Sequence, residues 1–218
     1  MSKIGITAFF SLPNTFTIIN AVLGLFAIYN IIIGNLILPA RIVLLAIFFD
    51  SFDGFLARKK NSVAEFGRTL DSLSDIISFG IVPAFIFIIS SNDNIIRLLI
   101  GFAYVIFGLL RLSRFNALNS NEYVGLPITL GAIFVVLLFL AKIPDYINSI
   151  IMILTSILFI SNFKLKRPSK NGNYLIVFSS LFIIISLVPY PMIVLVSRLL
   201  LIILPAMFLI YLFRYSQS

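Results

Sequence analysis

Apolar residues fill this chain in long runs, and short polar breaks separate the runs. Each run is about long enough for a helix that crosses the hydrocarbon core of a bilayer, which needs roughly 20 residues. No soluble domain stands apart from them, so residues 1–218 are expected to form a single membrane domain. The pattern predicts an all-α, polytopic transmembrane helix bundle of about eight spans, at residues 12–33, 36–58, 67–91, 95–117, 125–142, 145–162, 173–188 and 191–213.

Two local signals refine this prediction. Gly80 and Pro83 lie inside the third span and predict a kink, which a membrane helix tolerates where neighbouring helices cover the freed backbone groups. The tight connection at Val188-Pro189-Tyr190-Pro191 separates the seventh span from the eighth.

Composition places the chain in the membrane class, because 61% of the residues are hydrophobic and only 11% are charged. The mean hydropathy of +1.14 agrees. The absence of cysteine excludes disulfides and thiol catalysis, and the absence of histidine leaves carboxylates as the general bases. The net charge of +8 fits basic loops beside anionic headgroups, so we expect membrane lipids and no nucleic acid as partners.

Basic residues set the expected orientation of the spans. If the N-terminus is cytoplasmic, twelve Lys and Arg residues fall at cytoplasmic helix ends, and only Arg41, Arg97 and Lys142 fall at the other side. This asymmetry follows the positive-inside rule and places both termini in the cytoplasm. We therefore expect an integral protein of the cell membrane.

Five of the eight acidic residues, four aspartates and Glu65, lie between positions 50 and 75, and the aspartates lie in segments that are otherwise apolar. A basic and polar run at 58–62 is long enough to turn the chain back antiparallel, so the two acidic pairs can face each other near the cytoplasmic face. Helical spacing places small and acidic residues on one face of each helix: Asp50, Asp53, Gly54 and Ala57 on the first, and Gly67, Asp71 and Asp75 on the second.

Four clustered carboxylates cannot all stay ionised in a low-dielectric site without a cation. Without His or Cys the ligands are all oxygen, which suits hard divalent ions such as Mg²⁺ or Mn²⁺. Together with the small residues beside the acids, this suggests a two-metal site for a phosphate ester or anhydride. The alternatives are acids that only pair with Arg58 and Arg68, and a cation transporter that uses intramembrane acids.

The acidic stretch resembles the signature of the CDP-alcohol phosphotransferases at each position: Asp50-x₂-Asp53-Gly54-x₂-Ala57-Arg58-x₈-Gly67-x₃-Asp71-x₃-Asp75. The resemblance implies that the four aspartates hold two divalent cations and that Asp75 is also the catalytic base. It implies that a CDP-lipid lies between the second and third helices, where we expect it to contact Asn14, Thr17, Gly54, Ala57, Arg58 and Gly67. For Asn14 and Thr17, helix capping and interhelical hydrogen bonds are an equal alternative.

Further segments look like the branch of the family that uses L-serine as the acceptor of the phosphatidyl group. They are residues 12–24, 71–84, 113–116 and 125–129, whereas residues 145–213 carry no motif of this kind. Several relatives carry a basic residue where this chain has Asn20. The alternative acceptor within the family is glycerol 3-phosphate or an inositol phosphate, which would need more cationic ligands.

The acceptor pocket is predicted from the cytoplasmic end of the fourth span. A cation beside the metals would bind the carboxylate of serine, so Arg111, Arg114, Asn116 and Ser78 are the candidate acceptor ligands. The alternative for the two arginines is ordinary anchoring by snorkelling side chains. We also expect the protein to form a homodimer.

Overall fold

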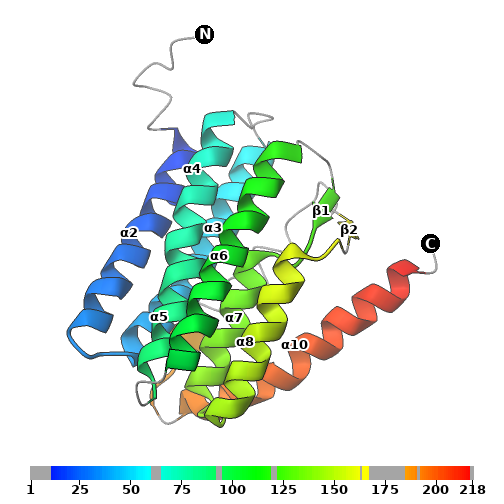
Figure 1. Ribbon diagram of the computed structural model, residues 1–218. Helices are drawn as coiled ribbons and strands as arrows, with labels where there is room; N and C mark the ends of the chain where they lie inside the picture. Colours follow the sequence, from blue (N-terminus) through cyan, green and yellow to red (C-terminus); the bar gives the residue numbers. More distant parts are fainter. Residues whose placement is uncertain are drawn as a thin grey trace.

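The protein is a bundle of upright helices in a computed structural model (Figure 1). The structure describes residues 11–59, 65–91, 95–118, 122–162, 164–166, 185–190 and 192–216, and only the backbone at 53, 55, 57–59, 122–123, 164–166 and 205–216. The described helices are α2 (Leu12–Ile32), α3 (Ile37–Lys59), α4 (Glu65–Asp75), the π-helix η1 (Ile76–Ile81), α5 (Val82–Ile89), α6 (Ile95–Leu118), α7 (Ile128–Leu140), α8 (Asp145–Ile160) and α10 (Met192–Ser216).

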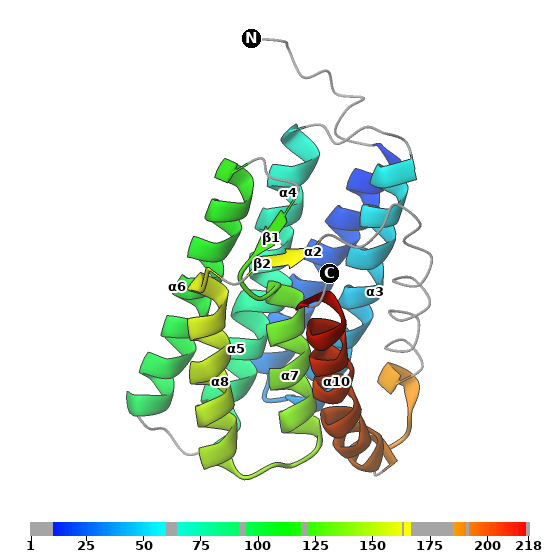
Figure 2. The same ribbon diagram turned by 90° about the vertical axis from the view of Figure 1, so that its right-hand side faces the viewer.

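From α2 to α8 the chain passes alternately down and up the bundle in Figure 1, with α4, η1 and α5 forming one pass, so helix ends gather at two levels. The beginnings of α2 and α4 and the ends of α3 and α6 lie at the end that is uppermost in Figure 1, which we call the upper end. Figure 2 shows α7 and α10 on the side of the bundle away from α2. The acidic residues of α3 and α4 therefore share the upper end, as their positions in the sequence predicted.

Helix α2 begins where local chemistry favours a helix start. Ser11 is the N-cap, and its side chain accepts a hydrogen bond from the backbone N–H of Asn14 at 3.5 Å. Pro13 occupies the first turn, where its missing N–H costs nothing. The helix packs along α3 and along the combined α4 and η1.

The third predicted span is one continuous helix with a change of type inside it. Helix α4 passes into the six-residue π-helix η1 and then into α5. The N–H of Val82 bonds to the carbonyl of Ile77, five residues back, as a π-turn requires. The kink predicted from Gly80 and Pro83 therefore takes the form of a π-helical insertion, which sequence reasoning did not anticipate.

A short antiparallel ribbon interrupts the all-α pattern. Strand β1 (Glu122–Val124) pairs with β2 (Lys164–Lys166), so that Glu122 is opposite Lys166. The fifth predicted span was expected from residue 125, but α7 starts only at Ile128 because Pro127 precedes it and the ribbon and Gly125 take up the earlier residues. The prediction of an all-α bundle holds for the body of the fold and misses this ribbon.

Within the described residues, three helices are long and apolar enough to cross a membrane: Leu12–Ile32, Glu65–Ile89 and Ile95–Leu118. Shorter apolar helices lie at Ile128–Leu140, Asp145–Ile160 and Met192–Leu204. Most of the seventh predicted span, 173–188, lies outside the described residues. The count of eight spans and the cytoplasmic position of the termini stay predictions.

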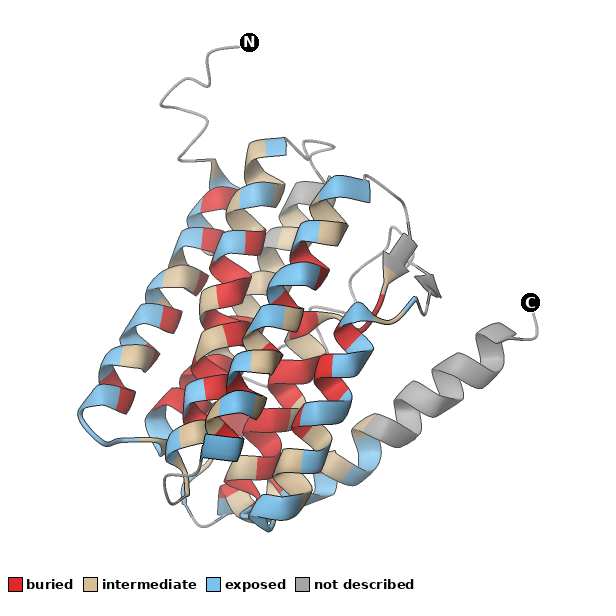
Figure 3. Ribbon diagram, viewed as in Figure 1, coloured by how far each residue is buried: buried red, intermediate tan, exposed pale blue. Residues whose placement is uncertain are grey.

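Buried residues lie on the sides of the helices that face the inside of the bundle, and exposed residues lie on the outer sides (Figure 3). Inward faces carry the buried core, including Phe79 and Tyr104. Outward faces expose large apolar side chains, such as Leu25 and Phe26 on α2 and Ile106 on α6. A surface of this kind suits contact with lipid rather than water, because contiguous exposed apolar patches are uncommon on soluble monomers. The protein is an integral membrane protein.

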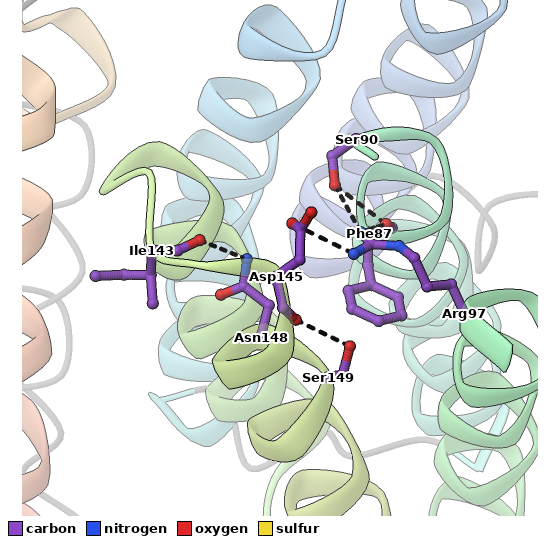
Figure 4. A network of polar contacts seen from close by, with 7 residues as sticks. All are labelled: Phe87, Ser90, Arg97, Ile143, Asp145, Asn148 and Ser149. Atoms are coloured by element: carbon purple, nitrogen blue, oxygen red, sulfur yellow. Dashed lines mark hydrogen bonds and ion pairs between the residues drawn. The ribbon is translucent and has the colours of Figure 1, made fainter. Parts of the chain in front are cut away.

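Arginine side chains hold the lower end of the bundle together. Arg97 of α6 donates to the carbonyl of Phe87 and to the hydroxyl of Ser90 at 2.9 Å, and pairs with Asp145 of α8 at 3.3 Å (Figure 4). This single buried guanidinium connects α5, α6 and α8. Arg198 of α10 likewise donates to the carbonyl of Ala141, just after α7, at 3.1 Å.

Candidate active site

Three aspartates converge at the upper end of the bundle. Asp50 comes from α3, and Asp71 and Asp75 come from α4, where their spacing of four residues places them one turn apart on the same face. One carboxylate oxygen of each lies within 4.8 Å of the others. The antiparallel arrangement of α3 and α4 brings together residues that are more than twenty positions apart in the sequence.

The side chains of Asp53, Ala57 and Arg58 lie outside the part of the chain that the structure describes. Their backbone belongs to α3, so Asp53 follows Asp50 by less than one helical turn. Gly54, the other small residue of this stretch, is half-buried in the same helix.

Asp75 is the most deeply placed of the three described acids, with 7% of its surface exposed. Its Oδ1 accepts a hydrogen bond from the Nδ2 of Asn20, on α2, at 3.4 Å. Asn20 itself has no exposed surface. The amide therefore supports the carboxylate from the α2 side.

Two serine hydroxyls fasten α2 to the helix that carries the acids. Ser74 donates to the carbonyl of Thr17 at 3.0 Å, and Ser78 donates to the carbonyl of Asn20 at 2.9 Å. Gly24 permits the close approach, because a Cβ there would lie 2.5 Å from the hydroxyl oxygen of Ser78. Small residues and interhelical hydrogen bonds of this kind are typical of helix contacts in membranes.

A buried cation stands beside the acids. Arg111 of α6 is only 6% exposed, and its charge attracts that of Asp71. Its guanidinium lies over the ring of Phe115, 5.5 Å from the centroid. Near it, the hydroxyl of Ser72 donates to the Oδ1 of Asn116 at 3.3 Å, which connects α4 to α6. Arg111 and Asn116, two of the predicted acceptor ligands, thus both lie next to α4.

The carboxylates have the chemistry of a site for a hard cation. The Oδ1 of Asp71 is buried and accepts no hydrogen bond from any residue that the structure describes. A buried carboxylate oxygen without a partner is costly, and a cation between the three acids would remove that cost. Because every ligand is an oxygen, the cluster could hold a metal ion such as Mg²⁺ or Mn²⁺.

The residues predicted to bind the CDP-lipid lie around the same end. Asn14 and Gly67 face each other across α2 and α4, since a Cβ on Gly67 would lie 3.2 Å from the Oδ1 of Asn14. Thr17 is buried one turn further along α2, and its hydroxyl donates to the carbonyl of Pro13 at 3.2 Å. The interhelical bond at this position uses the backbone carbonyl of Thr17, which accepts from Ser74, so the role of the Thr17 side chain stays a prediction.

Arg114, another predicted acceptor ligand, contacts the backbone in the described structure. Its guanidinium donates to four backbone carbonyls, those of Val124, Phe159, Ile160 and Ser161, at 2.9–3.1 Å. These carbonyls belong to the end of α8 and to β1, so Arg114 closes a helix C-terminus and holds the ribbon. We leave it out of the acceptor pocket.

Gly125 completes this arrangement with a backbone that favours glycine. Its φ is +79°, and a Cβ there would collide with the carbonyl of Phe159 and with the guanidinium of Arg114. A glycine is thus needed for Arg114 to reach its carbonyl partners.

Ser78, also predicted as an acceptor ligand, is likewise bonded to the backbone. It lies in η1, has no exposed surface, and uses its hydroxyl to hold α2. It is below the acids, toward the middle of the bundle, so we assign it to the support of the site rather than to acceptor binding.

Sequence reasoning missed one buried polar residue near the site. Tyr104 of α6 has no exposed surface, and its hydroxyl donates to the carbonyl of Phe79 in η1 at 3.1 Å. Pro83 was a signal that this carbonyl would need a donor, because proline lacks the N–H that bonds four residues back in an α-helix. The sequence did not indicate which side chain would supply the donor.

The fold and the site together define a class of protein: a mainly helical integral membrane protein with a cluster of aspartates that could hold a cation and a buried arginine beside it. Within that class the chain belongs to the CDP-alcohol phosphatidyltransferase family, whose model matches residues 10–161.

Individual relatives agree with this family. The chain is 38% identical over 173 residues to an archaetidylserine synthase of Methanothermobacter thermautotrophicus, which covers 77% of this chain and 74% of that protein. It is 40% identical over 156 residues to a CDP-diacylglycerol–serine O-phosphatidyltransferase of Methanocaldococcus jannaschii, covering 71% of this chain and 73% of that protein. A protein of the same name from Bacillus subtilis is 34% identical over 131 residues, covering 58% of this chain and 74% of its own.

Proposed function

We propose that the protein transfers the phosphatidyl group of a CDP-diradylglycerol to the hydroxyl of L-serine, forming a phosphatidylserine-type lipid and CMP. The observation that carries the proposal is the convergence of Asp50, Asp71 and Asp75 in a chain of this family, with Arg111 buried next to them. The names of the similar proteins support serine as the acceptor.

The proposed reaction is a displacement at the lipid-side phosphorus of the CDP-lipid. The serine oxygen forms a bond to this phosphorus while the bond to the bridging oxygen breaks, and CMP leaves with that electron pair. Asp75 accepts the proton of the serine hydroxyl as the general base. The amide of Asn20 holds one oxygen of Asp75, which limits the rotation of the carboxylate and directs it toward the acceptor.

We propose that Asp50, Asp53, Asp71 and Asp75 hold two divalent cations, Mg²⁺ or Mn²⁺. When bound, these ions would offset the negative charge that develops on the phosphoryl and leaving-group oxygens. The unsatisfied Oδ1 of Asp71 supports its assignment as a ligand.

The CDP-lipid would lie among α2, α3 and α4, beside the acids. We assign its contacts to Asn14, Thr17, Arg58 and Gly67, with Gly54 and Ala57 leaving room for it. A nucleotide substrate favours a site at the cytoplasmic face of the cell membrane, where nucleotides are found. The homodimer stays a prediction of the sequence.

Serine is distinguished from the alternative acceptors by its charges. Its carboxylate needs one cation, which Arg111 would supply, whereas a phosphorylated acceptor brings two negative charges. On α2, the position next to Asp75 is the neutral Asn20 rather than a basic residue. Both features favour an amino acid over a sugar or polyol phosphate.

Product analysis tests the proposal. The purified, full-length protein is incubated with CDP-diradylglycerol and, separately, with serine, glycerol 3-phosphate, an inositol phosphate and other amino alcohols. Mass spectrometry of the lipid products is expected to show a phosphatidylserine-type lipid with serine and little product with the others. If glycerol 3-phosphate or an inositol phosphate gives the dominant product, that compound and not serine is the acceptor.

Arg111→Lys is expected to raise the KM for serine more than the KM for CDP-lipid. A lysine keeps the charge but loses the bidentate contact that a guanidinium makes with a carboxylate. Losing a charged hydrogen bond of this kind costs about 1.5–3 kcal/mol, so the rise should be about 10- to 150-fold. Steady-state kinetics with each substrate varied in turn measure the two constants.

Arg114→Lys is the matched control. Because Arg114 binds backbone carbonyls at the end of α8, its replacement should lower the thermal stability and leave the serine KM near that of the parent. If Arg111→Lys changes only the KM for CDP-lipid, Arg111 binds the diphosphate and the serine carboxylate has another partner.

A further inference from the structure

The π-helix η1 begins directly after Asp75, the last residue of α4. A π-turn closes its backbone hydrogen bond over five residues instead of four, so it contains one more residue than the α-helix. One residue corresponds to about 100° of rotation in an α-helix of 3.6 residues per turn. The face that α4 presents to α3 therefore depends on η1 keeping its register with respect to α5.

One carbonyl in η1 accepts a hydrogen bond from another helix. After the π-turns, the carbonyl of Phe79 would normally accept from the N–H of residue 83, but Pro83 has none. A carbonyl without a donor is expensive in an apolar, membrane-embedded interior. The hydroxyl of Tyr104 supplies that donor at 3.1 Å.

The surroundings of Tyr104 hold its hydroxyl in place. Its ring packs against Phe159 of α8, with the centroids 5.1 Å apart. Gly131 of α7 leaves the space for both, because a Cβ there would lie 2.5 Å from the ring of Phe159 and 3.1 Å from the hydroxyl oxygen of Tyr104. Three helices thus position one hydroxyl toward one carbonyl.

The same face of α6 also contacts the helix of the acids above η1. Arg111 lies seven residues, about two turns, after Tyr104, and its charge attracts that of Asp71. Gly108 lies between them and approaches Ile76, since a Cβ on it would be 3.6 Å from the side chain of Ile76. Helix α6 therefore meets this helix both before the π-turns, beside the acids, and within them, at Phe79.

We propose that Tyr104 is a positioning residue: its hydroxyl, by binding the carbonyl of Phe79, keeps the π-helical register that aims Asp71 and Asp75 at Asp50. Tyr104 does not touch the acids and acts through the backbone of η1. The expected effect on kcat rests on the proposed function. The expected effect on metal binding rests only on the carboxylate cluster.

Tyr104→Phe removes the hydroxyl and keeps the ring. We expect it to lower kcat about tenfold, the factor that corresponds to about 1.4 kcal/mol for one buried hydrogen bond, and to weaken Mn²⁺ binding by a similar factor. The KM for serine should change less than twofold. The full-length protein in detergent is titrated with Mn²⁺ and followed by electron paramagnetic resonance. Tyr146→Phe, which removes a hydroxyl from an exposed tyrosine at the lower end, is the matched control.

A second substitution separates this role from packing. Pro83→Ala supplies an N–H that can bond the carbonyl of Phe79 in the ordinary α-helical way, while the π-bond from Val82 to Ile77 is kept. In the Pro83→Ala background, the effect of Tyr104→Phe on kcat and on Mn²⁺ binding should shrink to less than about threefold. If Pro83→Ala does not fold, 4-aminophenylalanine at position 104, which keeps a donor, should restore both values and 4-methylphenylalanine should not.

Two results would overturn the proposal. One is a Tyr104→Phe protein that matches Tyr146→Phe in both kcat and Mn²⁺ affinity. The other is a Tyr104→Phe substitution that lowers kcat and Mn²⁺ affinity equally in the parent and in the Pro83→Ala background. In the experiment with the phenylalanine analogues, the corresponding result is an equal loss of both values with either analogue. Either outcome would mean that Tyr104 acts by packing alone. If the parent protein makes no serine lipid, the proposed function fails, and the Mn²⁺ titrations still decide the role of Tyr104.

Discussion

Asp75→Asn is expected to lower the single-turnover rate of phosphatidyl transfer by about 10²- to 10⁴-fold, the usual contribution of a general base. Asparagine has nearly the same size and keeps one acceptor oxygen, but it does not take up a proton at neutral pH. Rapid-quench measurement of CMP release, with enzyme in excess over CDP-lipid, isolates the chemical step. Binding of CDP-lipid should persist, because the other acids remain.

Glu65→Gln is the control for Asp75→Asn. It neutralises an exposed carboxylate at the start of the same helix, away from the cluster, and should leave the rate unchanged. A single-turnover rate for Asp75→Asn within about tenfold of the parent would exclude Asp75 as the general base. The proton acceptor would then have to be another of the clustered acids.

Removal of divalent metal is expected to abolish the reaction, with a fall of at least about 10²-fold. The reason is electrostatic: carboxylate oxygens of Asp50, Asp71 and Asp75 lie within 4.8 Å of one another, and without a metal ion their negative charges would repel the reacting phosphate. Metal ions typically supply several kcal/mol of stabilisation to such a transition state, and each 1.4 kcal/mol is tenfold in rate. Activity is measured after exhaustive dialysis against EDTA.

Adding back Mg²⁺ or Mn²⁺ should restore the activity, which shows that the protein has not been denatured. In Asp71→Asn, the metal concentration needed for half-maximal activity should rise, because the carboxylate with the unsatisfied oxygen is lost. Full activity of the EDTA-treated parent would show that the reaction does not need a metal ion bound by these acids. The fold would then need another explanation for three acids that are placed so close together.

The cluster of acids is the part of this protein that the sequence by itself determined. Helical spacing alone puts Asp71 and Asp75 on one face, and a polar run at 58–62 returns the chain so that Asp50 meets them. These are local relations, set by 3.6 residues per turn and by a short connection. The structure confirms that these three residues come together, and the family match confirms the resemblance read from the signature.

The roles of Arg111 and Arg114 could not be separated in the sequence. They are three residues apart near the end of one helix, with the same charge and the same apolar neighbours. Only the packing of α6 against α4 on one side and α8 on the other decides that Arg111 is close enough to Asp71 to attract its charge, while Arg114 binds the carbonyls at the end of α8. A difference of three positions in a helix rotates a side chain by about 60°, which is enough to point it to another neighbour.

The π-helix and its partner were decided by tertiary structure as well. Gly80 and Pro83 show that the third span is irregular, but they do not show whether the irregularity is a bend or an inserted residue. The choice depends on whether a neighbouring helix offers a donor at the right height, as Tyr104 does for Phe79. The periodicity of the sequence along one helix determines which residues share a face of that helix. The hydrogen-bond partner of each polar group depends instead on contacts between helices that are distant in the sequence.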